Sequence, residues 1–370
     1  MKYYLIAGEA SGDLHGSNLI RNLRNMDQEA EFRCFGGDLM REAGGTIALH
    51  YKKMSFIGII EVVKHLRTIS RTLVYCKKDM ISFRPDALIL IDYPGFNLKM
   101  AEFAKNHGIR TLYYIAPKIW ASRKYRIRLI RRAVDKLYVI LPFEEEYFRS
   151  LGCDAEYNGN PLTDAIADFS PSDDIVFRKD NDLSTEPIIA LLAGSRKSEI
   201  KLCLPEMLRA CSKLTGYQLV LAGAPSIRKE YYEPFLKNSR VKLVYNKTYE
   251  LLHRAKAAVV TSGTATLETA LFRVPEVVLY KVMQLTYLIG RPFFRIRFFS
   301  LVNIIMDREV VKEFLQFRLA EKIRTELHAI LTDRDYNHKM IHEFEELSGK
   351  IGSPGTSARV AKSMYTYLTD

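Results

Sequence analysis

Two successive sets of short apolar runs, each alternating with helical patterns, organise this chain. The runs are bounded by glycine or proline, which is typical of buried parallel strands. Each set therefore predicts one doubly wound α/β sheet with helices on both faces. The predicted strands are Tyr3–Ala7, Glu31–Phe35, Asp86–Ile91, Thr111–Ile115 and Lys136–Ile140 in the first set, and Ile188–Ala193, Tyr217–Ala222, Val241–Tyr245, Ala257–Thr261 and Glu276–Tyr280 in the second.

The length of the chain favours two domains, because 370 residues are too many for one ordinary core. The polar segment Asp168–Glu186 lies between the two sets and is the candidate linker. We predict two Rossmann-like domains, residues 1–167 and 168–355, facing each other across a central cleft. A break at Gly349–Gly355 precedes a last helical pattern, and the helix 356–370 is expected to pack back on the first domain.

The net charge of +12 implies an anionic partner, such as nucleic acid, a phosphorylated ligand or an acidic membrane surface. Nucleic acid is not expected, since no helix-turn-helix, RNP or zinc-finger pattern is present. The five cysteines are scattered and form no C-x-x-C pair, which argues against a disulfide framework and favours a reducing cytoplasm. The chain starts directly with a strand rather than a signal peptide, and no uncharged apolar run reaches about 18 residues, so no membrane span is expected.

Acidic residues follow two predicted strands of the first domain. The turn Gly8–Asp13 carries Glu9 and Asp13, and we expect a helix to begin near Asp13. Because a phosphate cradle avoids carboxylates, these acids suit hydroxyl recognition or proton abstraction better. The glycine spacing is also not G-x-G-x-x-G, so a nucleotide is expected to bind elsewhere.

Asp92 follows the strongly apolar strand Ala87–Ile91. A carboxylate at the carboxyl end of such a strand points into the site crevice. Partial burial would raise its pKa and make it a usable general base. The alternative is a turn-forming aspartate before a proline-glycine turn.

Two turns of the second domain are typical of anion binding. Gly194, Ser195 and Arg196 follow one strand, and a helix N-terminus after them would face the same anion. The turn Ser262–Thr264, with Gly263 at its centre, opens another helix, and Glu268 one turn later could bind ribose hydroxyls. The alternatives are an ordinary strand-to-helix turn with an exposed arginine, and a hydroxyl cap followed by a first-turn acid.

One segment and two basic stretches suggest a membrane surface. Residues Phe56–Lys78 have helical periodicity, with apolar residues near one face and basic residues on another, as in helices that lie on anionic membranes. A domain helix with its apolar face in the core is an equal alternative. The apolar positions are Ile59, Val63, Leu66, Ile69 and Leu73, the basic ones are Lys64, Arg67, Arg71 and Lys78, and the basic stretches are Arg123–Arg132 and Arg291–Phe299.

Signals for a metal are poor. Two D-x-D strings, Asp180–Asp182 and Asp333–Asp335, follow no predicted strand of the second domain. His338 and His342 are spaced for one helix face but lack a third ligand. We therefore expect all three to be solvated surface. A G-x-S-x-G elbow is absent as well.

The motifs together resemble those of lipid-A-disaccharide synthases, over nearly the whole chain. The matching stretches, in order, are Gly8–Asp13, Phe56–Val62, Ile91–Asn97, Gly194–Arg196, Ser262–Glu268 and Leu301–Ile305. This resemblance implies a GT-B fold, with acceptor binding in the first domain and UDP-sugar binding in the second. It implies an inverting hexosyltransferase that moves 2,3-diacylglucosamine from UDP to the 6-hydroxyl of 2,3-diacylglucosamine 1-phosphate (lipid X). Such enzymes need no metal or other cofactor and lie on the cytoplasmic face of the inner membrane.

The resemblance also suggests roles for single residues. Asp92 would be the base, with Glu9 the second candidate. Arg196 and the Ser262–Thr264 turn would stabilise the departing UDP, and Glu268 would hold its ribose. The residues expected at the acceptor or the sugars are Ser11, Gly12, Asp13, Asn97 and Asn303.

Four short stretches depart from the family pattern, and none removes the proposed base. Ala193 replaces a usual proline and Gly95 replaces a second aspartate. The stretch Ala116–Ser122 and the residue Val302 also differ from the usual motifs. These changes bear on loop shape and acceptor contacts.

Other functions remain open from the residues alone. The nearest are other GT-B enzymes, namely a membrane UDP-GlcNAc transferase or a UDP-GlcNAc 2-epimerase. A non-catalytic basic membrane- or nucleic-acid-binding protein is a different class, and a nicotinamide dehydrogenase lacks its fingerprint. A homodimer through Tyr287–Phe299 is possible, although that segment could equally face lipid.

Overall fold

The computed structural model describes residues 1–54, 66–283 and 297–370, which form two compact units. The first unit contains Met1–Asp164 and Ile351–Asp370, and the second contains Ala165–Lys350. The chain thus leaves the first unit within helix α8 (Pro161–Ala167) and returns at the end of helix α17 (Arg334–Ile351). Both crossings lie a few residues before the boundaries expected from the sequence.

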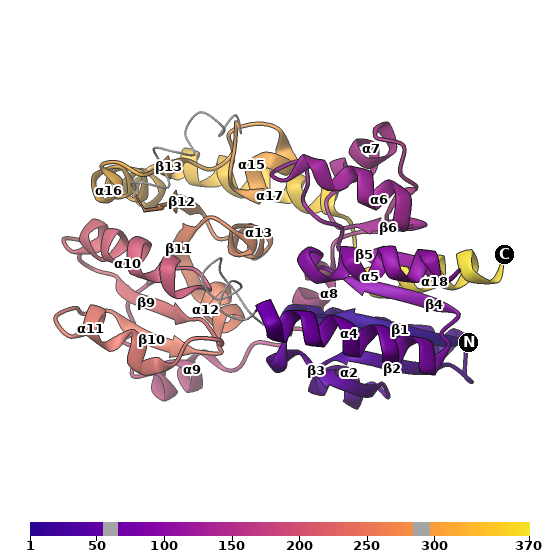
Figure 1. The fold of residues 1–370 in the computed structure, drawn as a ribbon. Helices are drawn as coiled ribbons and strands as arrows, with labels where there is room; N and C mark the ends of the chain where they lie inside the picture. Colours follow the sequence, from indigo (N-terminus) through magenta and orange to yellow (C-terminus); the bar gives the residue numbers. More distant parts are fainter. Residues whose placement is uncertain (55–65, 284–296) are drawn as a thin grey trace. The chain divides into compact units, whose positions relative to one another are not determined.

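The first unit is built on a parallel seven-stranded sheet in the order β3-β2-β1-β4-β5-β6-β7 (Figure 1). Successive residues of its strands alternate between two apolar cores. Tyr3 and Leu5 contribute to the core under α1 (Ala10–Met26) and α18 (Thr356–Thr369), whereas Tyr4 and Ile6 contribute to the core on the other face. That face is covered by α4 (Leu66–Phe83), α5 (Pro94–Asn106), α6 (Ile127–Ala133) and α7 (Pro142–Ser150). The strands are β1 (Lys2–Ala7), β2 (Glu31–Gly36), β3 (Thr46–His50), β4 (Ala87–Ile91), β5 (Arg110–Tyr114), β6 (Lys136–Val139) and β7 (Ala155–Tyr157).

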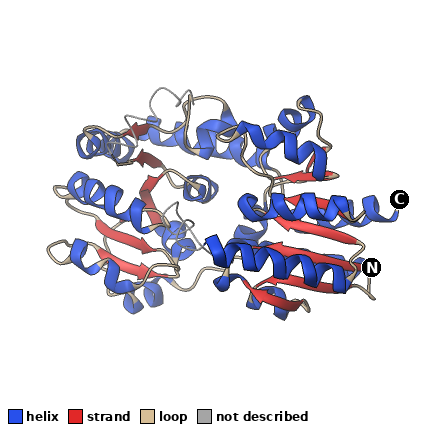
Figure 2. Cartoon of the chain, in the orientation of Figure 1, coloured by secondary structure: helices blue, strands red, loops and turns tan. Residues whose placement is uncertain are grey.

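Helices cover both faces of this sheet (Figure 2). The last helix returns to the first unit, where its residues Val360, Ala361 and Met364 join the core of α1. Arg110 donates hydrogen bonds to the carbonyls of Tyr367 and Leu368 at its end. The helices are α1 (Ala10–Met26), α2 (Asp38–Glu42), α4 (Leu66–Phe83), α5 (Pro94–Asn106), α6 (Ile127–Ala133), α7 (Pro142–Ser150), α8 and α18 (Thr356–Thr369), with 3-10 turns at Tyr51–Lys53 and Lys124–Arg126.

The second unit has a parallel six-stranded sheet in the order β10-β9-β8-β11-β12-β13. Its strands are β8 (Ile188–Leu192), β9 (Gln218–Gly223), β10 (Lys242–Tyr245), β11 (Ala255–Thr261), β12 (Glu276–Tyr280) and β13 (Glu313–Leu315). Its helices are α9 (Asp174–Asp180), α10 (Lys197–Cys211), α11 (Glu233–Leu236), α12 (Thr248–Arg254), α13 (Thr264–Leu271), α15 (Leu301–Met306), α16 (Leu319–Thr332) and α17, with a 3-10 turn at Lys229–Tyr231.

The predicted α/β class with two doubly wound parallel sheets is confirmed. Three strands were missed, and each of them is an edge strand: β3, β7 and β13. Their residues are mostly only half-buried, so they lack the continuous apolar run of a central strand. The predicted linker also contains a helix, α9, which Asp173 caps and whose Phe177 is buried.

The predicted surface helix Phe56–Lys78 is only partly described. Its residues 56–65 lie outside the described chain, as do residues 284–296, which hold most of the predicted basic stretch Arg291–Phe299. The described part is α4, where Leu73 packs against the core, as expected for a domain helix with its apolar face in the core. The exposed side of α4 nevertheless carries Val74 and Ile81 among basic residues.

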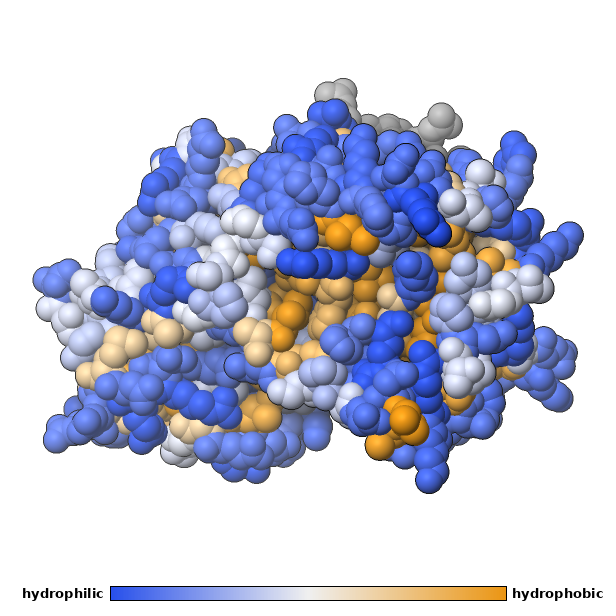
Figure 3. Space-filling model, turned by 180° about the vertical axis from the view of Figure 1, so that it is seen from behind, coloured by the Kyte–Doolittle hydropathy of each residue, from blue (hydrophilic) through white to orange (hydrophobic). Residues whose placement is uncertain are grey.

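Most of the face shown in Figure 3 is hydrophilic. Among the described helices, none is both long enough and apolar enough to cross a membrane.

Candidate functional site

In the first unit, the candidate site lies where β1 and β4 end side by side. These strands pair in parallel with Ala7 opposite Ile91, so Glu9 and Asp92 follow neighbouring strand ends. The strand order reverses between β1 and β4. Open α/β sheets bind ligands at such a reversal, beyond the carboxyl ends of the strands. The structure therefore brings the two predicted acidic turns to one edge of one sheet.

The backbone at Asp92 is held by its neighbours in a rarely adopted conformation. Asp92 and Tyr93 have φ angles of 45° and 48°, in the left-handed region. The Asp92 carbonyl accepts hydrogen bonds from Asn97 Nδ2 at 2.7 Å and from the Tyr113 hydroxyl at 2.6 Å, and the Asp92 amide donates to the Tyr114 carbonyl at 3.1 Å. Strained backbone of this kind persists only when the surroundings fix it, and it clusters at functional sites.

Tyr93 joins the turn of Asp92 to the turn of Glu9. A Cβ atom on Gly8 would lie 2.3 Å from Cγ of Tyr93, so the tyrosine ring leaves room only for glycine. The Tyr93 hydroxyl donates to the Met54 carbonyl at 2.8 Å. Burial, and then the nearby charge of Glu9, raise the pKa of Tyr93. The two turns are thus packed against each other.

The two acids at this edge are accessible. Glu9 is the N-cap of α1, with extended backbone, and its side chain does not cap the helix. The helix therefore begins at Ala10, three residues earlier than Asp13, where the sequence placed its start. Asp92 is exposed. The partial burial expected for Asp92 is therefore not found.

Asp13 is a structural cap rather than an open ligand. Its side chain is 3% exposed. Its two oxygens accept hydrogen bonds from the amides of Gly37, Leu39 and Met40 at 2.7, 3.1 and 3.2 Å. The carboxylate thus satisfies the first amides of α2, as acids at helix N-termini do. Its predicted contact with a sugar gives way to this positioning role.

Ser11 and Gly12 occupy different environments in the first turn of α1. Ser11 is exposed, whereas Gly12 is buried. A Cβ on Gly12 would lie 3.1 Å from Cβ of Ala7, so the glycine lets the helix approach β1. Of the two, only Ser11 presents a side chain that a ligand could reach.

The two predicted asparagines are fully buried, and their side chains form hydrogen bonds within the protein. Asn97 donates to three carbonyls, and Asn303 fixes the chain ahead of β13. Their roles are therefore to hold strands and turns, and the predicted contacts with sugar or phosphate are revised accordingly. The partners of Asn97 are the carbonyls of Ile6, Ile91 and Asp92, and those of Asn303 are the amides of Val310 and Val311, the carbonyl of Val311 and Glu313 Oε1.

The second unit repeats this arrangement at β8 and β11. These strands are neighbours where the strand order reverses, and Leu192 pairs with Val260. The turns Ala193–Arg196 and Thr261–Thr264 therefore follow adjacent strand ends. The structure brings these two predicted turns to one edge of the second sheet.

Glu199 occupies the amides of the Gly194–Arg196 turn. Its Oε2 accepts from the amides of Ser195 and Arg196 at 3.0 and 3.3 Å, and its Oε1 accepts from Nη1 of Arg196 at 2.8 Å. Gly194 has φ +102°, and a Cβ there would lie 2.6 Å from Glu199 Oε2. An anion would therefore meet the Arg196 guanidinium here, because the two amides already bind a carboxylate.

Hydrogen bonds hold the Ser262–Thr264 turn in place, and part of the turn is exposed to solvent. The Ser262 hydroxyl donates to the Phe299 carbonyl at 2.6 Å, and Thr266 Oγ1 donates to the Gly263 carbonyl at 2.9 Å. Gly263 and Thr264 are exposed at the start of α13. This exposed helix start can receive a negatively charged group.

Glu268 lies one turn into α13 and is half-buried. It accepts a hydrogen bond from the Tyr249 hydroxyl at 3.1 Å. Burial raises its pKa, and the bond from Tyr249 opposes that shift. Tyr249 therefore fixes one carboxyl oxygen, and a hydroxyl-bearing ligand could meet the other.

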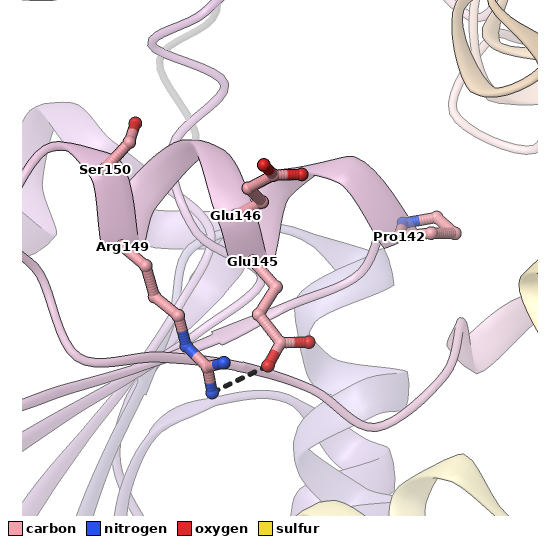
Figure 4. A pocket seen from close by; sticks show the side chains of 5 residues that line it. All are labelled: Pro142, Glu145, Glu146, Arg149 and Ser150. Carbon is pink, nitrogen blue, oxygen red and sulfur yellow. Dashed lines mark ion pairs between the residues drawn. The ribbon is translucent and has the colours of Figure 1, made fainter.

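A surface cavity of about 430 Å³ lies along α7 of the first unit. Glu145 and Arg149 point toward each other and form an ion pair of 2.7 Å, while Glu146 and Ser150 point to the other side (Figure 4). The cavity gathers no strand-end residue, so we do not assign it to the site.

The acids of the two D-x-D strings can be located in the structure as well. Within residues 1–54, 66–283 and 297–370, no group of three or more His, Cys, Asp or Glu is arranged to hold a metal ion. Asp182 forms an ion pair with Lys242, and Asp333 accepts from the amide of Tyr336. These acids have local structural partners.

Sequence reasoning missed three residues that support the site. Tyr113 lies inside an apolar strand run, and Tyr249 belongs to α12, the helix before that of Glu268, so only the fold reveals their contacts. Glu199 carried a readable signal, because an acid three residues after a helix start is typical of a capping box.

Comparisons with known proteins identify the family and the fold. The sequence model of the family described as Lipid-A-disaccharide synthetase matches residues 3–358. The lipid-A-disaccharide synthase of Syntrophus aciditrophicus is 39% identical over 98% of this chain and 97% of its own length, and that of Myxococcus xanthus is 36% identical over 98% and 97%.

Solved structures show the same fold at low identity. The UDP co-structure of S. aureus MnaA has a TM-score of 0.68 at 14% identity, covering 100% of this chain and 97% of that one. The UDP-GlcNAc 2-epimerase from Neisseria meningitidis bound to UDP-GlcNAc has a TM-score of 0.67 at 12% identity, covering 99% and 100%. The GT-B-like fold is thereby confirmed. With the near full-length sequence matches, the chain belongs to the lipid-A-disaccharide synthetase family.

Proposed function

We propose that this glycosyltransferase moves 2,3-diacylglucosamine from UDP to the 6-hydroxyl of 2,3-diacylglucosamine 1-phosphate. The products are a β-1,6-linked disaccharide 1-phosphate and UDP. Family membership over almost the entire chain supports the activity. The observation that supports the mechanism is the pairing of Ala7 with Ile91: Glu9 and Asp92 follow these neighbouring strand ends, and open α/β sheets bind ligands beyond such ends.

In this mechanism the first unit activates the acceptor. Asp92 takes the proton of the 6-hydroxyl as that oxygen attacks the anomeric carbon of the donor sugar. The bond from the anomeric carbon to the UDP oxygen breaks on the opposite face, so the configuration inverts. Tyr113 and Asn97 hold the Asp92 backbone and act as positioning residues. Glu9 is the alternative base and otherwise binds an acceptor hydroxyl.

The second unit binds UDP in this proposal. Negative charge grows on the diphosphate as the glycosidic bond breaks. The Arg196 guanidinium and the exposed start of α13 would stabilise that charge. Glu268, oriented by Tyr249, would accept hydrogen bonds from the ribose.

We further propose that the protein works on the anionic cytoplasmic face of the inner membrane. Arg67, Arg71 and Lys78 share one face of α4 with Val74 and Ile81, and all five are exposed. A face that mixes basic and apolar residues suits an acidic lipid surface. If Arg71→Gln/Lys78→Gln sedimented with phosphatidylglycerol vesicles as fully as the unaltered protein, this assignment would fail.

Replacing Asp92 by asparagine tests the base. Asp92→Asn keeps the size and the backbone bonds but cannot accept the proton, so turnover should fall by about 10²–10⁴. The measurement is the initial rate of disaccharide formation, with Glu9→Gln beside it and Glu146→Gln, an exposed acid of α7, as control. Full turnover in Asp92→Asn would refute the assignment, and a larger loss in Glu9→Gln would transfer the role to Glu9.

Removing the Tyr113 hydroxyl tests the positioning of Asp92. Tyr113→Phe deletes one of the side-chain bonds to the Asp92 carbonyl, and a displaced base should lower kcat roughly 10- to 100-fold. KM for the UDP-sugar should stay unchanged, because UDP is bound by the other unit. Tyr138→Phe makes the same change in a buried tyrosine of the next strand and serves as control. An unchanged kcat would show that the hydroxyl has only a structural role.

Neutralising Arg196 tests the donor site. Arg196→Gln should weaken UDP binding by roughly one to two orders of magnitude, because charge-assisted hydrogen bonds to phosphate are lost. Calorimetric titration with UDP measures this directly. Lys201→Gln removes an exposed charge one turn along the same helix and should bind UDP normally. Equal affinities in the two variants would exclude Arg196 from the donor site.

A further inference from the structure

A second cavity of the first unit lies between α5 and α6, and no step of the mechanism uses it. Its volume is about 220 Å³. It is formed by the 3-10 turn before α6, by one face of α6 and by the third turn of α5. Its lining residues are Glu102, Tyr125, Arg126, Arg128, Leu129 and Arg132.

The charges of this cavity are unbalanced. Glu102 forms an ion pair with Arg132 across it. Among the described residues, none forms an ion pair with Arg126 or Arg128, so the cavity keeps two unneutralised guanidinium groups. Arginine presents its donors in a planar fork that matches the oxygens of a phosphate, and such bonds are among the strongest in proteins.

Apolar surface adjoins these arginines. Tyr125 is 71% exposed, the highest value after Ile175 among the large exposed apolar side chains of the described residues. Leu129 is half-buried beside it. A phosphate carried on a lipid has apolar groups next to its charge, whereas free phosphate has none. The combination therefore fits a lipid-linked phosphate better than a free ion.

The cavity also lies on the side of the first unit where lipid is expected. α5 and α6 cover the same face of the sheet as α4, whose outer side mixes basic and apolar residues. Burial, and then the charge of Asp92, raise the pKa of Tyr113, and Arg126 is near enough to that hydroxyl to oppose the shift. The Tyr113 hydroxyl in turn donates to the Asp92 carbonyl. One end of the cavity is therefore close to the residues that position the proposed base.

We propose that this cavity binds the phosphate group of an anionic lipid, with Arg126 and Arg128 as its ligands and Tyr125 and Leu129 against the adjoining apolar part. Two sources carry this chemistry, namely the 1-phosphate of the acceptor and the headgroup of a membrane phospholipid. The first source rests on the proposed function, and the second does not.

The test compares two double variants with equal net charge. Arg126→Gln/Arg128→Gln removes the cavity arginines, and Lys124→Gln/Arg131→Gln removes two exposed cations of the same segment that do not line the cavity. Two experiments are made with each: steady-state kinetics in neutral detergent micelles, which give KM and kcat for the acceptor, and cosedimentation with phosphatidylcholine vesicles that contain phosphatidylglycerol.

Each source predicts its own result. If the acceptor phosphate binds here, KM for the acceptor rises about tenfold or more in the cavity variant, with kcat and vesicle binding as in the control. If membrane phospholipid binds here, vesicle affinity falls about tenfold or more below the control, and KM in neutral detergent is unchanged. Equal KM and equal vesicle binding in the two variants would overturn the proposal, since the charge would then act only diffusely.

Failure of the proposed function would be recognised separately. An unaltered protein that forms no disaccharide refutes the transferase activity, but its vesicle binding does not depend on turnover. In that case equal sedimentation of the two variants overturns the cavity proposal, and a selective loss in the cavity variant supports it. Glu102→Gln adds an independent check, because it frees Arg132 and should strengthen binding to the same vesicles.

Discussion

The parallel pairing of β1 with β4 is the constraint on which the candidate site depends. It brings two turns that are more than 80 residues apart in sequence to one edge of a sheet. The Asp92 carbonyl is then fixed by Asn97 from the following helix and by Tyr113 from the next strand. These buried hydrogen bonds fix the backbone of Asp92, while its side chain stays exposed.

The candidate site of the second unit has the same topology as that of the first. Its turns follow β8 and β11, again where the strand order reverses. Glu199 fills the amides of one turn and holds the Arg196 guanidinium in an ion pair, while the start of α13 is exposed. In the proposed mechanism, the first unit supplies the base and the second unit stabilises the charge on the departing UDP.

The central strands and the four turns could be predicted from the sequence, and the reasons are physical. A central strand is buried on both faces and must be continuously apolar, whereas the edge strands β3, β7 and β13 are not and were missed. Residue type alone could not show that the polar groups of Asp13, Asn97 and Asn303 form hydrogen bonds inside the protein. Their hydrogen-bond partners lie in other turns or strands. The sequence therefore could not distinguish an acid or amide with a structural role from one that binds a ligand.

The family resemblance indicates a much narrower function than the composition does. Charge alone left nucleic acid, phosphorylated ligands and membranes open, and the short glycine turns are common to many α/β proteins. The order of the motifs, together with near full-length similarity to lipid-A-disaccharide synthases, narrows these to one activity. The structure then adds what the motifs do not contain, namely the residues that position Asp92 and the cavity beside α6.

The most direct test of the account is a single transfer assay with the unaltered protein. UDP-2,3-diacylglucosamine and 2,3-diacylglucosamine 1-phosphate would be incubated with it in neutral detergent micelles that contain EDTA, and the products identified by mass spectrometry. The account predicts a disaccharide 1-phosphate and an equal amount of UDP. Intact substrates, or conversion of the donor without any dependence on the acceptor, would contradict it.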